Sequence, residues 1–480
     1  MPAFSASRRR FLACLASAVL SVAVAAETAA PRVVFVPFED ARPALQLLAH
    51  LLPTELREKD SASLESFWPR WVRQSDASIR ARLAQGDEDS LVNLLLFGTT
   101  FTAQPRITAR HIEKILASSS DPSVGGASLD RLTQSRLDDF ALAIAAPRRN
   151  ERFDFARTIF EAHGDNPDTS EGRNRIKARL LRALGRVLKE IDTNGRIIEQ
   201  ARALPDPGAE FAERSKLYRA RGLSSDTSLL PNFAVEEALK AMRAGGIVAG
   251  PIRRVAVIGP GLDFADKLEG YDFYPQQTLQ PFAVIDSLLR VGLSTAGDVR
   301  VTTFDVSPRV NAHLNALGAR ARAGQPYIVQ LPLETDEPWS SDVVRYWAAF
   351  GDRIGAPAIA PAVPPSAGAL KVRAVRIRPA VAASLTPLDL NIVLQQLEVP
   401  AAEQFDLIVG TNVFLYYDEF QQALAMANIQ RMLRRGGVLL SNNALPELPS
   451  SRVRLAGHTT LVYSDRKDSG DTIGWYKCVE

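Results

Sequence analysis

Three groups of residues in the second half of the chain have types and spacing suited to binding chemistry. A Gly-rich turn, Gly259-Pro260-Gly261, follows the apolar run Arg253–Ile258, and Asp305 ends the run Val299–Phe304. Asn412 follows a third apolar run, Phe405–Val409. Glycines let a backbone turn tightly and approach a ligand closely, while carboxylates and amides supply hydrogen-bonding groups. The three groups therefore predict a ligand site built from turns that follow strands.

Residues 405–443 indicate which elements must position these groups. An apolar strand enters the polar turn Gly410-Thr411-Asn412, a helix follows, and Gly436-Gly437 leads to a second strand, Val438–Ser441. Such a unit is typical of a parallel sheet with its functional loop at the carboxyl end of the first strand. Strand and helix patterns alternate over about 233–480, which predicts a Rossmann-like α/β sheet.

This unit resembles the fourth and fifth strands of class I S-adenosylmethionine-dependent methyltransferases. The segment Asn412-Val413-Phe414-Leu415-Tyr416-Tyr417-Asp418 is most similar to the chemotaxis-receptor methyltransferases. The class also places an antiparallel hairpin after strand five, and Thr459–Tyr463 with Thr472–Cys478 fits one. The resemblance covers about half of the chain. It implies methyl transfer from S-adenosylmethionine to an acceptor that the sequence does not identify, either a protein carboxylate or a small molecule.

The resemblance also implies a role for individual residues. Gly259 and Gly261 would hold the cofactor's amino-acid carboxylate, helped by the positive end of the helix that follows. Asp305 would accept hydrogen bonds from the two ribose hydroxyls. Asp389 would contact the adenine amino group, with Asn391 a near-equal candidate, because both Lys371–Ile377 and Ala380–Leu385 fit the third strand.

The catalytic assignments follow from the polar turn. Asn412 would face the methyl donor, and Tyr416 and Tyr417 would wall the pocket, since aromatic and oxygen-lined pockets favour a sulfonium methyl. Methyl transfer is an in-line displacement that depends more on positioning than on a strong acid or base. We predict no metal at this site, because the five histidines of the chain are scattered and lack metal-ligand spacing.

The sequence departs from the family pattern at three positions. Val257 stands where an acid usually precedes the first glycine, Asp263 replaces the third glycine, and Thr411 replaces an arginine beside Asn412. Asp263, a cofactor-binding candidate, and Asp266 are the two residues that could take over the ligand's ammonium group.

Structural alternatives exist for these residues. Asp305 or Ser307 could cap a helix that begins at Pro308. Asp389 and Asn391 could be turn or capping residues, and Phe414 and Leu415 could simply pack a helix on the sheet.

The first half of the chain predicts a helical domain without a catalytic signature. Apolar residues recur at helical spacing from Pro43 to about Gly245. The early segment Pro31–Pro37 fits a short strand, although a proline stands at each of its ends. The predicted division is therefore an all-α domain over 27–232, which could bind a substrate or protein partner, and a methyltransferase domain over 233–480. An insertion at about 325–370 contains a predicted helix, Ser340–Arg353, and a Pro/Ala-rich linker or loop over the site, Gly355–Gly368.

Residues 1–26 predict a secretory signal. Ser7-Arg8-Arg9-Arg10-Phe11-Leu12 precedes an uncharged run that ends in small residues, and the same order resembles a twin-arginine signal. Without its three arginines the chain has 54 basic and 54 acidic residues, so no charge excess supports nucleic-acid binding. No other segment predicts a membrane span. A periplasmic or secreted location is expected, with a cytoplasmic or inner-membrane-anchored one as the alternative.

Export conflicts with a methyltransferase, because S-adenosylmethionine is made in the cytoplasm. Three resolutions are open. The N-terminus could be a non-cleaved anchor or a mis-assigned start, or a folded, cofactor-loaded protein could pass through the twin-arginine route. The alternative hypothesis is an exported, non-catalytic binding or interaction protein that retains a degenerate methyltransferase fold. Val257, Asp263 and Thr411 fit such a loss of constraint.

Overall fold

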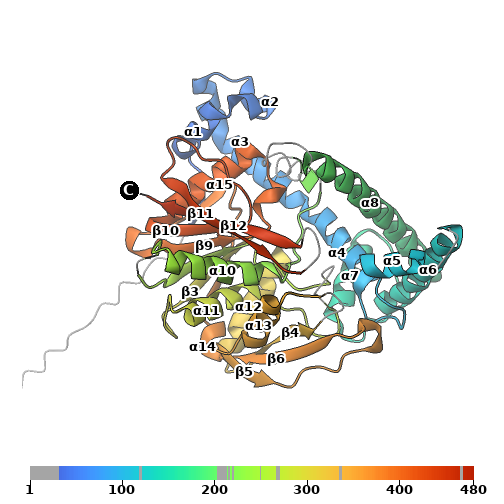
Figure 1. Cartoon of the computed structure of the whole chain (residues 1–480). Helices are drawn as coiled ribbons and strands as arrows, with labels where there is room; N and C mark the ends of the chain where they lie inside the picture. The colour runs from blue at the N-terminus through green and yellow to red at the C-terminus, as the bar shows by residue number, and fades with distance from the viewer. Residues whose placement is uncertain are drawn as a thin grey trace, which may run out of the picture.

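The computed structural model describes residues 32–117, 122–202, 213, 217–218, 221–248, 250–265, 271–334, 338–464 and 469–479. The predicted signal, residues 1–26, and the candidate Asp266 lie outside these ranges. Figure 1 shows a central sheet flanked by helices, a bundle of N-terminal helices beside it and a second, smaller sheet.

The central sheet has seven strands in the described part of the chain. In spatial order they are β11 (Val453–Val462), β12 (Gly470–Cys478), β10 (Leu433–Ser441), β9 (Phe405–Gly410), β2 (Arg254–Ile258), β3 (Arg300–Asp305) and β7 (Leu385–Asp389). All pairs from β10 to β7 are parallel, and β12 runs antiparallel to both of its neighbours. The chain moves outward from β2 to β3 and β7 and then returns to β9 on the other side of β2. The carboxyl end of β2 is therefore a topological switch point.

The topology confirms the predicted α/β sheet, the strands at Phe405–Val409 and Val438–Ser441, and the C-terminal hairpin. The third parallel strand is β7, and neither predicted range was right. Lys371–Ile377 forms a strand of the smaller sheet, while Pro379–Ala382 forms a short helix, α14. Both runs are short and apolar, so periodicity alone did not separate them.

Alternating side chains of the buried strands enter two apolar layers. Val255 and Val257 of β2 pack with α10 (Pro231–Ala244), α11 (Gln280–Val291) and α12 (Pro308–Arg322). Ala256 and Ile258 pack on the opposite face with α15 (Glu419–Met432), which Asp418 and Gln421 begin with a capping box. Both faces are covered, as a parallel sheet requires.

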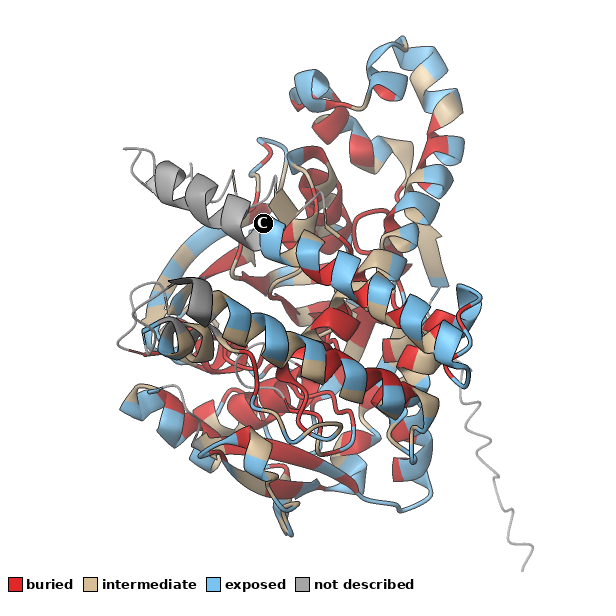
Figure 2. Cartoon of the chain, turned by 90° about the vertical axis from the view of Figure 1, so that its right-hand side faces the viewer, coloured by how far each residue is buried: buried red, intermediate tan, exposed pale blue. Residues whose placement is uncertain are grey.

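The N-terminal half is helical but not purely so. Its helices are α1 (Phe38–Leu47), α2 (Thr54–Arg57), α3 (Ser61–Ala81), α4 (Leu83–Phe97), α5 (Ala109–Ala117), α6 (Pro122–Ala145), α7 (Glu151–Ala162) and α8 (Ser170–Arg202). The strand β1 (Arg32–Phe35) corrects the all-α prediction, because it pairs antiparallel with β8 (Gln395–Glu398). Side chains of α1 and α3 share a core with α15, while α4, α6, α7 and α8 lie to the side (Figure 1). Figure 2 shows buried residues along the sheet and exposed outer faces on the long helices.

The insertion forms a small antiparallel sheet and a helix, and their apolar side chains join the core on one face of the central sheet. It contains β4 (Tyr327–Glu334), α13 (Ser341–Ala349), β5 (Gly355–Ala358) and β6 (Lys371–Ile377), and the antiparallel order is β4-β6-β5. The predicted helix is confirmed, whereas part of the predicted linker is strand β5. This sheet lies at the far side of the molecule from α1 (Figure 1).

Two negative findings apply to the described ranges given above. No helix there is long and apolar enough to cross a membrane. No group of three or more His, Cys, Asp or Glu residues in those ranges could hold a metal ion.

Candidate functional site

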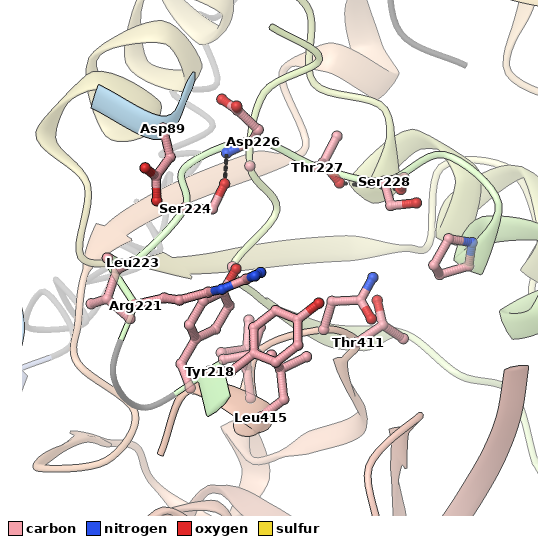
Figure 3. Close-up of a pocket in the computed structure, with 18 of the residues that line it drawn as sticks. Asp89, Tyr218, Arg221, Leu223, Ser224, Asp226, Thr227, Ser228, Thr411 and Leu415 are labelled. Carbon is pink, nitrogen blue, oxygen red and sulfur yellow. Dashed lines mark hydrogen bonds between the residues drawn. The ribbon is translucent and has the colours of Figure 1, made fainter. Parts of the chain in front are cut away.

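A cavity of about 480 Å³ opens at the switch point, at the carboxyl ends of β2, β3 and β9. This volume lies within the range of small-molecule sites, and the location is where open α/β sheets bind ligands. Six of the predicted site residues line it together: Gly259, Gly261, Asp305, Asn412, Tyr416 and Tyr417. Its remaining walls include residues of α4, α8, Tyr218, the segment 221–231, the loop after β7 and the hairpin. Figure 3 shows Asp89, Tyr218 and Arg221 among them.

The Gly-rich turn requires glycine at both positions. Gly259 and Gly261 have φ angles of 62° and 59°, in the left-handed region. A Cβ at Gly259 would lie 2.8 Å from the Val413 side chain, and one at Gly261 would lie 3.0 Å from Cβ of Thr227. The turn is therefore closely packed between the Asn412 loop and the segment that precedes α10.

The N–H groups of this turn are already used. Gly259 donates to the Phe304 carbonyl at 2.8 Å, Leu262 to Ser225 at 2.9 Å and Asp263 to Gln277 at 2.8 Å. The Gly261 N–H lies near the Asp305 carboxylate and lowers its pKa, and Pro260 has no N–H. The prediction that a helix follows the turn directly was wrong: α11 begins at Gln280, after a loop over 271–279 that packs on the helical half.

Asp305 faces the cavity from the end of β3. Its carboxylate accepts a hydrogen bond from the Ser307 N–H at 2.8 Å, and the Gly261 N–H lies near it. Burial raises the pKa of this carboxyl to about 6, against the lowering effect of those two donors. Ser307 occupies the N-cap of α12 without a side-chain capping bond. Asp305 thus organises the start of α12 and still borders the cavity.

Asn412 adopts the left-handed conformation, with φ of 58°, which asparagine tolerates better than most residues. Its N–H donates to Oδ1 of Asn442 at 2.8 Å, and Nδ2 of Asn442 donates back to Oδ1 of Asn412 at 2.7 Å. Asn442 follows β10, so this reciprocal pair ties two neighbouring strand ends together. Thr411 accepts a hydrogen bond from Gln280 at 2.6 Å.

Tyr416 and Tyr417 both line the cavity, and burial raises both phenol pKa values, that of Tyr417 to about 12. The Tyr416 ring meets Tyr218 edge-on, with ring centroids 5.6 Å apart. Both phenols therefore remain neutral around pH 7 and can serve as walls and hydrogen-bond donors.

Two predicted cofactor-binding residues do not line the cavity. Asp263 is fully buried behind the turn, where it accepts hydrogen bonds from Tyr274 at 2.9 Å and Gln277 at 2.8 Å. Asp389 is exposed and pairs with Arg80 at 2.7 Å. The alternative candidate, Asn391, is buried and donates to Asp76 at 2.8 Å.

Sequence reasoning missed the segment that covers the turn. Ser225 and Thr227 pair with Leu262 on both sides, and Tyr218 and Arg221 reach the cavity from just before them (Figure 3). The segment has no motif, because its role depends on backbone pairing with a distant turn. The only local signal in this segment is Gly222, where a Cβ would clash with the backbone of Gly86, so that a glycine there indicates close packing.

The charged lining is mainly acidic. Among the described residues it contains one guanidinium, Arg221, and five carboxylates: Asp89, Glu190, Asp226, Asp305 and Asp471. Several of these acids are paired, such as Asp89 with Arg186 at 2.5 Å. The excess of acids favours a ligand that carries positive charge.

Fold and site together define a Rossmann-like α/β protein with a ligand cavity at its switch point. No protein-family model matches the sequence, and no curated protein matches it either. Among solved structures, the chain is similar to magnesium protoporphyrin IX methyltransferase (ChlM) from Synechocystis PCC 6803 with bound SAM, at 9% identity and a TM-score of 0.25, over 59% of this chain and 90% of that one.

The chain is also similar to the glycopeptide N-methyltransferase MtfA. With SAM bound to MtfA the identity is 12% and the TM-score 0.21, over 52% of this chain and 77% of that chain. With S-adenosyl-L-homocysteine bound to MtfA, the identity is 13% and the TM-score 0.20, over 57% of this chain and 84% of that chain. Similarities of this size define no activity, so the case for function depends on the sheet order and the cavity.

Proposed function

We propose that the cavity binds S-adenosylmethionine and that the protein transfers its methyl group to an acceptor still to be identified. One observation carries this proposal: Gly259, Asp305 and Asn412, from the ends of three different strands, line a single cavity at the switch point. Cofactors bind open α/β sheets at this position. The acidic lining suits a ligand with an ammonium and a sulfonium group.

We assign the adenosine part to the Asp305 side of the cavity. The Asp305 carboxylate can accept hydrogen bonds from vicinal ribose hydroxyls, which are stronger than neutral bonds because the acceptor is charged. Apolar residues beside it offer an adenine pocket: Leu83, Leu223, Val306, Leu390 and Ile392. Asp389 does not line the cavity and pairs with Arg80, so we propose van der Waals packing in place of the predicted polar contact.

When bound, S-adenosylmethionine supplies a methyl group on a cationic sulfur. The chain's contribution is to fix the geometry of an in-line displacement and to exclude water. Asn412 is held rigidly by Asn442, so its turn can define one wall next to the sulfonium. Tyr416 and Tyr417, neutral and largely buried, close the same wall and present aromatic faces or edges to a cation.

Calorimetric titration of the purified full chain with S-adenosylmethionine tests the proposal. Binding to the wild-type protein is expected, and Asp305→Ala should weaken it by at least about tenfold, since a hydrogen bond to a charged group contributes roughly 1.5–3 kcal/mol. Asp389→Ala is the matched control, because Asp389 is the register partner of Asp305 but lies outside the cavity. Equal affinities for the two variants would contradict the Asp305 assignment.

The alternative is an exported binding protein with a degenerate methyltransferase fold. The observation that favours it is the Gly-rich turn, whose N–H groups at Gly259, Leu262 and Asp263 already have protein partners. A well-folded wild-type protein that binds no S-adenosylmethionine would support this alternative and refute methyl transfer.

We also propose the finer features of the sequence interpretation. These are a chemotaxis-receptor-like site around Asn412, a substrate- or partner-binding role for the helical half, and export through residues 1–26. Fractionation of the native cells tests the last of them. Recovery from the cytoplasm with Met1 retained would refute export.

A further inference from the structure

The only guanidinium among the described residues of the cavity lining belongs to Arg221, and its position is well defined. Its Nε lies 3.1 Å from Oε2 of Glu190, and its guanidinium carbon lies 5.0 Å from the centre of the Tyr218 ring. The side chain is 16% exposed. Figure 3 shows it extending across Tyr218 toward the centre of the cavity.

A second arginine, Arg82, connects the backbone at Arg221 to the Asn412–Tyr417 turn. Arg82 donates to the carbonyls of Arg221 at 3.0 Å, Tyr218 at 3.2 Å and Tyr416 at 3.0 Å. Arg221 and the Asn412–Tyr417 turn are therefore held as one unit. A guanidinium fixed in this way loses little entropy when it binds an anion.

No residue that the structure describes accepts a hydrogen bond from the terminal nitrogens of Arg221, Nη1 and Nη2, although Nε faces Glu190. A guanidinium presents its N–H groups in a planar fork that matches the two oxygens of a carboxylate. The described lining of the cavity therefore contains a bidentate donor whose terminal N–H groups have no acceptor within that lining.

The Gly-rich turn cannot fill the corresponding role. Its amides at Gly259, Leu262 and Asp263 donate to Phe304, Ser225 and Gln277, and that of Gly261 lies near the Asp305 carboxylate. The turn therefore has no pair of adjacent unbonded N–H groups for a ligand's carboxylate. A carboxylate in a cavity lined by five other acids needs a cationic partner.

We propose that Arg221 is the receptor for the amino-acid carboxylate of the methyl donor, in place of the Gly-rich turn. This inference rests on the proposed function. Glu190 orients the guanidinium through Nε, Tyr218 supports its face, and the two terminal nitrogens bind the carboxylate oxygens. The α-ammonium and sulfonium groups then lie on the acidic side of the same cavity.

The test compares two ligands that differ only in the carboxylate: S-adenosylmethionine and decarboxylated S-adenosylmethionine. Calorimetry on the full-length wild-type chain should give tighter binding of the carboxylated ligand by roughly 10- to 100-fold, the range for a charge-assisted pair. Arg221→Gln should bind both ligands with equal affinity, close to that of wild type for the decarboxylated one. Arg221→Lys, which keeps the charge but not the fork, should retain only part of the preference.

The decarboxylated ligand is also the internal control for folding, because its binding does not involve Arg221. Arg345→Gln, an exposed position on α13 outside the cavity lining, should leave both affinities unchanged. A wild-type preference that survives Arg221→Gln, or a variant that weakens both ligands equally, would overturn the assignment to Arg221 alone. Failure of both ligands to bind the wild-type chain would overturn the proposed function and this inference with it.

Discussion

We expect the ionised Asp305 carboxylate to lower the stability of the fold and to strengthen ligand binding. The substitution Asp305→Asn separates these two effects. The carboxyl is buried at the end of β3, and its pKa is raised from 3.8 to about 6. A folded-state pKa above the unfolded one means that the folded protein prefers the protonated form. The stability due to that preference is complete below about pH 4 and is lost as the pH rises through 6.

The size of the loss follows from the shift. Two pKa units at 1.36 kcal/mol each correspond to about 3 kcal/mol. Asparagine keeps the shape and an acceptor oxygen for the Ser307 N–H but does not ionise. The unfolding free energy of Asp305→Asn relative to wild type should therefore increase by about 3 kcal/mol between pH 4 and pH 8. Other titrating groups are common to both proteins and cancel.

Urea unfolding of both proteins at pH 4 and pH 8, followed by circular dichroism, measures this difference. Asp389→Asn is the control, since its carboxylate is exposed and should show no gain of this kind at pH 8. The same Asp305→Asn protein should bind S-adenosylmethionine more weakly at pH 8. A stability difference that is equal at both pH values, or that falls as the pH rises, would refute the reasoning.

Three further substitutions test the packing around the site by urea unfolding. Gly261→Ala should destabilise more than Gly297→Ala: both glycines have positive φ, but only at Gly261 would a Cβ crowd Thr227, so the excess, about 1–2 kcal/mol, reports that contact. Asp272→Ala should cost about 3 kcal/mol or more, because its buried carboxylate accepts four hydrogen bonds from Thr99 and Thr100; a loss below 1 kcal/mol would show those bonds to be unimportant. Asn412→Gly keeps the left-handed turn and should lose only about 1 kcal/mol, whereas Asn412→Ala should lose more, because both remove the side-chain pair with Asn442 and only alanine is strained at this φ; equal losses would show that backbone strain contributes nothing here.

Local sequence signals were sufficient where a residue's role depends on its position in a strand or turn. The runs at Arg254–Ile258 and Phe405–Gly410 are strands because they are apolar, short and bounded by glycine or polar turns. The carboxyl ends of parallel strands meet at one edge, so Gly259, Asp305 and Asn412 were expected together and lie together.

Local signals failed where burial decided the outcome. Asp263 and Asp389 are both acids close to strand ends, yet one is buried behind the turn with Tyr274 and the other pairs with Arg80 from α3. Likewise, the apolar run Lys371–Ile377 pairs with β4 of the insertion, and β7 is the strand that pairs with β3 in the main sheet. The position of each of these residues depends on contacts with residues that are more than ten, and often hundreds of, positions away in the chain.

The sequence by itself determined the parallel α/β sheet, the strands that precede Gly259, Asp305 and Asn412, and the position of these three groups at the border of the cavity. It did so because hydrophobic periodicity and turn chemistry are local properties. Only the tertiary structure decided that the segment with Ser225 and Thr227 would occupy the Gly-rich turn and that Arg221 would face the cavity. The pairing of backbone groups and the desolvation of charges depend on what the whole fold brings near them, which no short stretch of residues encodes.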